Sequence, residues 1–261
     1  MSDPNAYYAD GLGVAMYDLF TGGGLLEGDV DFYLEQARRL GGPILELACG
    51  TGRILLPLAQ AGHDVIGLDQ SRAMLDRAAE KFPARPGPRP QLIHGDMRDF
   101  RIGRRFGLII ITARGFQHLV DPADQRAALS CVRRHLRPGG HLILDLFDPS
   151  FELLFDPSPA ALPPREARHP RTGRLVRRSV IARETDKLRQ TIKETLRFEE
   201  SDASGVVVAA EETSWTLRWS LRQEVLYLFE LCGFAPVAQF SDFKGSPPAY
   251  GREQIWIAEA V

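Results

Sequence analysis

The chain has 261 residues, 44% of them hydrophobic and 25% charged, a composition typical of a globular protein with a sizeable core. A formal charge of -2 provides no field that would recruit nucleic acid or an anionic membrane, so we expect neither as a partner. We find no signal-peptide pattern and no apolar run of membrane-spanning length, so we expect a cytoplasmic protein. Cys49, Cys131 and Cys232 are widely spaced, which favours reduced thiols and no metal site.

Residues 1–40 combine aromatic side chains with glycines and end in an amphipathic stretch. The aromatic residues that precede this stretch are Tyr7, Tyr8, Tyr17 and Phe20, around the cluster Gly22-Gly23-Gly24. Apolar residues among charges predict a helix over Asp29–Leu40. The aromatic rings before it are equally suited to packing in the core and to a lid that excludes water from a site.

Apolar stretches alternate with helical patterns in the next hundred residues, which predicts a parallel sheet. The expected strands are Ile44–Ala48, Val65–Leu68, Leu92–Ile93, Phe106–Ile111 and His141–Phe147, and the expected helices are Arg53–Ala61, Ser71–Phe82 and one from Asp121-Pro122 to Arg137. Phe106–Ile111 is almost wholly apolar, as expected of a central strand covered on both faces. Asp121 can cap its helix, and Pro122 suits the first helical position.

The pattern changes after Phe147. Period-two alternation in Leu175–Glu184, Leu188–Phe198 and Val206–Leu217 predicts an inserted antiparallel sheet. A helix over Leu221–Cys232 and apolar stretches at Val237–Phe240 and Ile255–Ala258 then return to the first sheet. We predict an α/β fold in four parts: an arm and helix forming a lid (1–40), a Rossmann-like core (41–148), the inserted antiparallel sheet (149–220) and a C-terminal completion of the core (221–261).

A glycine turn separates the first expected strand from the first helix, in Ile44-Leu-Glu-Leu-Ala-Cys-Gly-Thr-Gly-Arg53. Gly50 and Gly52 allow the backbone to approach a ligand closely. Asp69 ends the next expected strand, where a carboxylate can accept hydrogen bonds from both hydroxyls of an adenosine ribose. Dinucleotide-binding turns have a third small residue where this chain has Leu55, which argues against a pyrophosphate ligand.

With this turn, Asp69 and the sequence Gly95-Asp96-Met97, the chain resembles the class I S-adenosylmethionine (SAM)-dependent methyltransferases. The resemblance implies a Rossmann-like seven-stranded sheet whose last strand is antiparallel, with SAM across the carboxyl ends of the first strands. It also implies cofactor contacts from Tyr17, Glu46, Ala48, Cys49, Gly50, Gly52, Asp69, Gln70, Met74, Asp96, Met97 and Thr112. Among these, Asp69 would hold the ribose and Asp96 the adenine amino group, while Ala48 replaces a glycine that many members have.

Residues 111–119, together with Gly95–Phe100 and Tyr17-Asp18, look similar to bacterial sugar-amine and related natural-product or peptide N-methyltransferases, which share the extra antiparallel sheet. In them the position of His118 lies in the active site and that of Tyr17 borders SAM. His118 and Tyr17 are therefore our candidate catalytic residues, with His118 as the group that accepts a proton from an amine or hydroxyl. A histidine after a strand can equally serve local hydrogen bonds.

The leading hypothesis is SAM-dependent methyl transfer to a nitrogen or oxygen of a small molecule, with a sugar amine or another natural product as the expected acceptor. One alternative is a SAM-binding regulatory or scaffold protein without catalysis. Another is a nucleotide-dependent oxidoreductase, which Leu55 opposes. The sequence predicts either a monomer or a homodimer formed through the inserted sheet.

Overall fold

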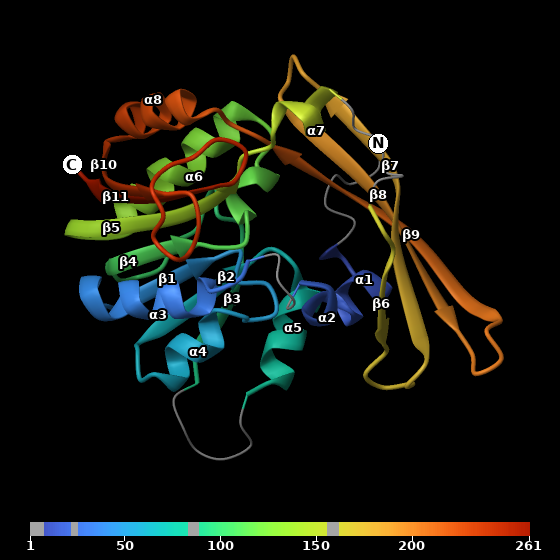
Figure 1. The fold of residues 1–261 in the computed structure, drawn as a ribbon. Coiled ribbons are helices and arrows are strands. Elements are labelled where there is room, and N and C mark those ends of the chain that lie inside the picture. Colours follow the sequence, from blue (N-terminus) through green and yellow to red (C-terminus); the bar gives the residue numbers. More distant parts are fainter. Residues whose placement is uncertain (1–7, 22–25, 83–88, 156–161) are drawn as a thin grey trace.

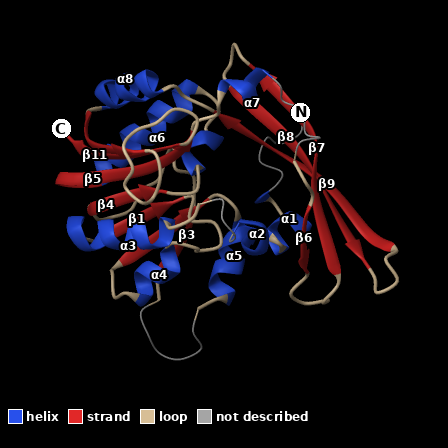
Figure 2. Ribbon diagram, viewed as in Figure 1, coloured by secondary structure: helices blue, strands red, loops and turns tan. Residues whose placement is uncertain are grey.

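The computed structural model describes residues 8–21, 26–82, 89–155 and 162–261, so Tyr7 and the glycines at 22–24 lie outside the described residues. These residues form two sheets, one on each side of the molecule in Figure 1 and drawn in red in Figure 2. The larger sheet contains β1 (Ile44–Leu47), β2 (Val65–Asp69), β3 (Gln91–His94), β4 (Phe106–Ile111), β5 (Leu136–Phe147), β10 (Phe234–Phe240) and β11 (Glu253–Ala260).

The strand order in this sheet is β10-β11-β5-β4-β1-β2-β3. Neighbours among β1 to β5 pair in parallel, whereas β11 is antiparallel to both β5 and β10. The expected seven-stranded sheet with an antiparallel last strand is therefore confirmed. The central position of Phe106–Ile111 is confirmed too, because β4 is the fourth of seven strands and all its residues are buried.

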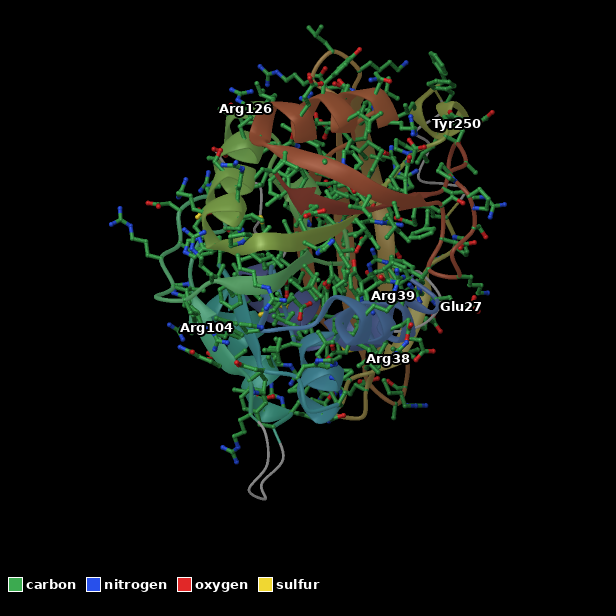
Figure 3. The ribbon with its side chains drawn as sticks, turned by 90° about the vertical axis from the view of Figure 1, so that its left-hand side faces the viewer. Glu27, Arg38, Arg39, Arg104, Arg126 and Tyr250 are labelled. Carbon is green, nitrogen blue, oxygen red and sulfur yellow. The ribbon has the colours of Figure 1, made fainter. Side chains whose placement is uncertain are left out.

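Helices cover both faces of this sheet. They are α3 (Asp29–Leu40), α4 (Leu55–Gln60), α5 (Arg72–Glu80), α6 (Pro122–His135) and α8 (Arg222–Cys232). The side chains of successive β4 residues lie on opposite faces of the sheet. Leu108 belongs to the apolar cluster with α3, α4 and α5, and Ile109 belongs to the cluster with α6 and α8. Charged side chains such as Arg38, Arg104 and Arg126 project from the outside of these layers (Figure 3). In the described part of the chain, no helix is long and apolar enough to cross a membrane.

Local sequence signals explain both ends of α6. Asp121 caps α6 by accepting a hydrogen bond from the amide of Ala123 at 2.7 Å, as expected. The expected strand start at His141 was wrong, because β5 already begins at Leu136. Pro138 disfavours helical backbone in the residue before it, and the chain is extended from Leu136 onward.

The second sheet is antiparallel, in the order β6-β7-β8-β9. Its strands are β6 (Arg165–Arg168), β7 (Leu175–Asp186), β8 (Thr191–Ser201) and β9 (Val207–Arg218). The short helices α1 (Gly11–Ala15) and α2 (Tyr17–Thr21) lie between the two sheets (Figure 1). There Met16 and Phe20 pack against Leu196 and Phe198 of β8. Strand β6 was not expected from the sequence, and the division of the chain into four parts stays a prediction.

The two sheets are joined at a short 3-10 helix, η2 (Gly115–His118), that follows β4. The buried Gln117 side chain accepts a hydrogen bond from the amide of Phe147 at 2.7 Å and donates one to its carbonyl at 3.0 Å. The same amide group donates to the carbonyl of Arg218 at 3.1 Å. One side chain thus connects the ends of β5 and β9. Nearby, α7 (Phe151–Phe155) contributes Leu154 to a small apolar cluster with Ile192 of β8.

Candidate functional site

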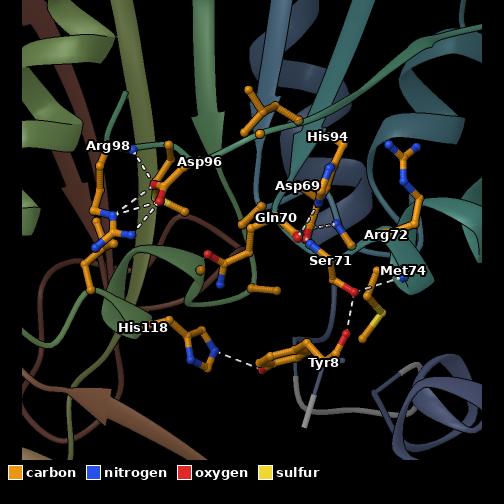
Figure 4. A pocket seen from close by; sticks show the side chains of 18 of the residues that line it. Tyr8, Asp69, Gln70, Ser71, Arg72, Met74, His94, Asp96, Arg98 and His118 are labelled. Atoms are coloured by element: carbon orange, nitrogen blue, oxygen red, sulfur yellow. Dashed lines mark hydrogen bonds and ion pairs between the residues drawn. The ribbon is translucent and has the colours of Figure 1, made fainter. Parts of the chain in front are cut away.

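A cavity of about 590 Å³ opens at the carboxyl ends of β1 to β4, a size suited to a small organic ligand. Ten of the expected site residues line it: Tyr17, Ala48, Gly50, Asp69, Gln70, Met74, Asp96, Met97, Thr112 and His118. Sequence reasoning did not assign to the site several further lining residues, including Tyr8, Ser71, Arg72, His94, Arg98 and Asp124. Figure 4 shows most of these side chains around the cavity.

The glycine turn and the acidic residue of β2 are directly bonded. The Asp69 carboxylate accepts from the amide of Gly50 at 2.7 Å and from the amide of Ser71 at 2.7 Å. Burial raises the pKa of Asp69, and these backbone donors oppose the rise. Gly50 has a φ of 53°. A Cβ built on it would meet no atom within 4 Å, so the turn presents bare backbone to open space.

Three expected cofactor residues are not among the cavity-lining residues. Glu46 is 1% exposed and accepts a hydrogen bond from the Thr112 hydroxyl at 2.9 Å. Burial raises its pKa to about 8, and the Thr112 hydrogen bond opposes this. Cys49 is buried against Gly67, and Gly52 lies beside Leu56. Contact of these three with a cofactor stays a prediction.

A charged group forms the rim near the end of β3. The Arg98 guanidinium pairs with the Asp96 carboxylate at 2.5 Å and with Asp124 at 2.7 Å. These bonds hold the pKa of Asp96 below its ordinary value. Asp96 is therefore an ionised hydrogen-bond acceptor at neutral pH, with Arg98 fixing its orientation.

The loop after β4 is held in an unusual conformation. Ala113 and Arg114 both have left-handed backbone, with φ of 52° and 64°, which costs a non-glycine residue about 1 kcal/mol or more. The buried Asp145 carboxylate of β5 accepts from both amides, at 3.0 and 2.8 Å. It also accepts from the Tyr33 hydroxyl at 2.7 Å. Asp145 thereby fixes the start of η2 and the placement of His118 at its end.

His118 contacts Tyr8, and both side chains line the cavity. Its Nε2 lies 2.9 Å from the Tyr8 hydroxyl, and the two rings meet edge to face at 5.0 Å between centroids. Burial lowers the pKa of His118 to about 4, and the backbone of Thr216 on β9 opposes the shift. The imidazole is therefore neutral at physiological pH and is a weak base.

Residues 44–140 match a family model described as a methyltransferase domain. Among curated proteins, the chain is 33% identical over 156 residues to the cypemycin N-terminal methyltransferase of a Streptomyces species, covering 58% of this chain and 60% of that protein. The first curated relatives are matched over 38% to 60% of their own length.

Solved structures resemble the chain over nearly its whole length. The CcbJ methyltransferase of Streptomyces caelestis superposes with a TM-score of 0.78 at 20% identity, covering 99% of both chains, which is a likeness of fold. A SAM-bound amino pentose methyltransferase of Micromonospora echinaspora superposes with a TM-score of 0.67 at 25% identity, covering 89% of each chain.

Proposed function

We propose that the chain is a SAM-dependent methyltransferase (EC 2.1.1), because residues 44–140 match a methyltransferase-domain model and nine of the twelve expected cofactor residues line one cavity. The observation that carries the proposal is the bond between the Gly50 amide and the Asp69 carboxylate. It sets an open backbone turn beside an acidic group at the carboxyl edge of a parallel sheet, where such folds bind ligands.

The residues present fit SAM. Asp69 would accept from the ribose hydroxyls, and the thioether side chains of Met74 and Met97 would border the adenine, whose amino group Asp96 would bind. The open turn at Gly50 has room for the methionine part. SAM supplies a methyl group already activated on a sulfonium, so the protein has chiefly to align the acceptor with it.

For the acceptor we propose a small molecule that offers a nitrogen or an oxygen. The amino pentose and N-terminal peptide methyltransferases among its relatives support an amine. The cavity reaches from Asp69 to His118 and Leu119, so an acceptor bound at η2 would share one space with the donor. His118 is neutral there and would help to position the acceptor's polar hydrogen without competing for it as a strong base.

The decisive test is calorimetric titration with SAM, S-adenosylhomocysteine and NADH. Binding of the first two alone supports the proposal, and binding of NADH alone contradicts it. Release of S-adenosylhomocysteine is then followed with a nucleotide-linked amino sugar, a peptide with a free N-terminus and glycine. SAM binding without turnover on any acceptor would favour the scaffold alternative. Light scattering distinguishes the monomer from the homodimer that the sequence left open.

A further inference from the structure

Tyr8 lines the cavity and is hydrogen-bonded through both its backbone carbonyl and its hydroxyl. Its carbonyl accepts a hydrogen bond from the hydroxyl of Ser71, which caps α5 two residues after Asp69, the residue proposed to bind the ribose. Its own hydroxyl lies 2.9 Å from Nε2 of His118. Figure 4 shows Tyr8 between these two residues. One arm residue therefore contacts both the donor side and the acceptor side of the site.

We propose that the hydroxyl oxygen of Tyr8 accepts a hydrogen bond from the N–H of the methyl acceptor, and that His118 holds this hydroxyl in position. The inference rests on the proposed function, because it places Tyr8 in the same methyl-transfer site. It gives His118 a positioning role behind Tyr8 in place of the proton-accepting role that the sequence suggested.

For this role the Tyr8 hydroxyl must donate its hydrogen bond to the imidazole. Nδ1 is buried and has no hydrogen-bond partner among the described residues, and Nε2 lies against the Tyr8 hydroxyl, so we place the ring proton on Nδ1 and leave Nε2 as the acceptor. Nε2 then accepts from the Tyr8 hydroxyl. A phenolic oxygen that donates its proton can still accept a hydrogen bond, and in this position it can accept one from an amine.

Packing also restricts the position of the Tyr8 ring. The ring meets Tyr17 edge to face at 6.3 Å between centroids, and it lies against an apolar cluster that includes Leu196 and Trp215 of the second sheet. The arm, the core and the second sheet thus all determine where the hydroxyl points. Such preorganisation is what an aligning group requires.

Methyl transfer to a neutral amine requires no base stronger than the uncharged side chains of Tyr8 and His118. A neutral amine that donates its N–H to the Tyr8 oxygen has its lone pair free to face the methyl group. The nitrogen–carbon bond forms as the carbon–sulfur bond breaks, the bonding electrons stay with sulfur, and the new ammonium keeps its proton. Tyr8 would therefore affect alignment, and hence turnover, more than it affects cofactor affinity.

The variant Tyr8→Phe keeps the ring and removes only the hydroxyl. We expect turnover to fall about tenfold, the effect of losing one aligning hydrogen bond, with SAM affinity changed less than about twofold. Because both residues act through one contact, the Tyr8→Phe/His118→Ala double variant should be no slower than His118→Ala alone. Tyr227→Phe, on the exposed side of α8, is the matched control and should leave turnover unchanged. Wild-type turnover in Tyr8→Phe, or multiplying losses in the double variant, would overturn the proposal.

A second readout needs no acceptor. In the SAM-free protein, NMR titration should give a higher His118 pKa in Tyr8→Phe than in the wild type, because a donor to the neutral imidazole is lost. An unchanged titration would refute the contact between Tyr8 and His118. Failure to bind SAM would instead contradict the proposed function, so the two failures are separable.

Discussion

Replacing Asp69 tests the cofactor site most directly. In Asp69→Ala, the Gly50 and Ser71 amides lose a charged acceptor at 2.7 Å each, and the two ribose hydroxyls of SAM lose the acceptor that we propose for them. A hydrogen bond to a charged group contributes about 1.5–3 kcal/mol. The two ribose bonds together predict a loss of about 3–6 kcal/mol in SAM binding, or roughly 10²- to 10⁴-fold in Kd.

Isothermal titration with SAM measures this loss, and thermal unfolding of the same sample confirms that the variant is folded. Asp64→Ala is the matched control, because Asp64 lies directly before β2, at the opposite end of the strand from Asp69. Its side chain is 64% exposed and, in the described part of the chain, forms an ion pair only with Arg104. We expect its SAM affinity to equal that of the wild type. Equal SAM affinity in folded Asp69→Ala would refute the assignment of the ribose site.

Three further predictions concern stability. Glu46 has a pKa of about 8 when folded against 4.5 as its ordinary value, so the folded state binds more protons between these pH values and stability falls as pH rises through the window. We therefore expect the free energy of unfolding of Glu46→Gln, measured in urea, to rise relative to that of the wild type by up to about 1.4 kcal/mol per pH unit from about pH 5 to 8. Parallel plots of the two free energies against pH would contradict the burial argument. Tyr33→Phe removes a hydrogen-bond donor from buried Asp145 and should lower the free energy of unfolding by about 1.5–3 kcal/mol. The control Tyr227→Phe, at an exposed position, should lower it by less than about 0.5 kcal/mol. Equal losses in the two variants would show that Asp145 does not depend on Tyr33. Gly67→Ala would place a Cβ 2.7 Å from Leu55 and 2.8 Å from the Cys49 sulfur. Its free energy of unfolding should fall by about 1–3 kcal/mol, which thermal unfolding would show as a lower melting temperature. In the control Gly103→Ala the new Cβ meets no atom within 4 Å, so this variant should unfold as the wild type does.

The parts of the fold that sequence could predict are those governed by local rules. Helix α3 occupies the predicted range Asp29–Leu40, since its apolar spacing and flanking glycines act within a few residues. Strand β4 was predicted correctly because only a strand buried on both faces is apolar throughout. Strand β6 escaped prediction because its sequence, Arg-Glu-Ala-Arg, is made a strand by pairing with β7 and by no pattern of its own.

The site divides in the same way. The glycine turn and Asp69 could be found from sequence because the turn and the strand end are local features 19 residues apart. The contact between Tyr8 and His118 joins residues 110 positions apart, and the bond between Tyr33 and Asp145 joins residues 112 apart. Their meeting depends on how β5, η2 and the arm pack together. Nothing in the sequence around Tyr8 marks it as a ring that reaches the cavity.

The amide of Gln117 has a consequence for how this molecule could be re-engineered. It connects the two sheets through backbone carbonyls and one backbone amide, at Phe147 and Arg218. Because backbone groups are common to every sequence, this connection could be kept with a foreign sheet in place of β6–β9 whose last strand ended in the same register, whereas the packing of Met16 and Phe20 against β8 would have to be redesigned. The larger sheet and its helices would then be kept unchanged, together with Gln117. A library of variants with exchanged second sheets could be screened for methylation of new acceptors.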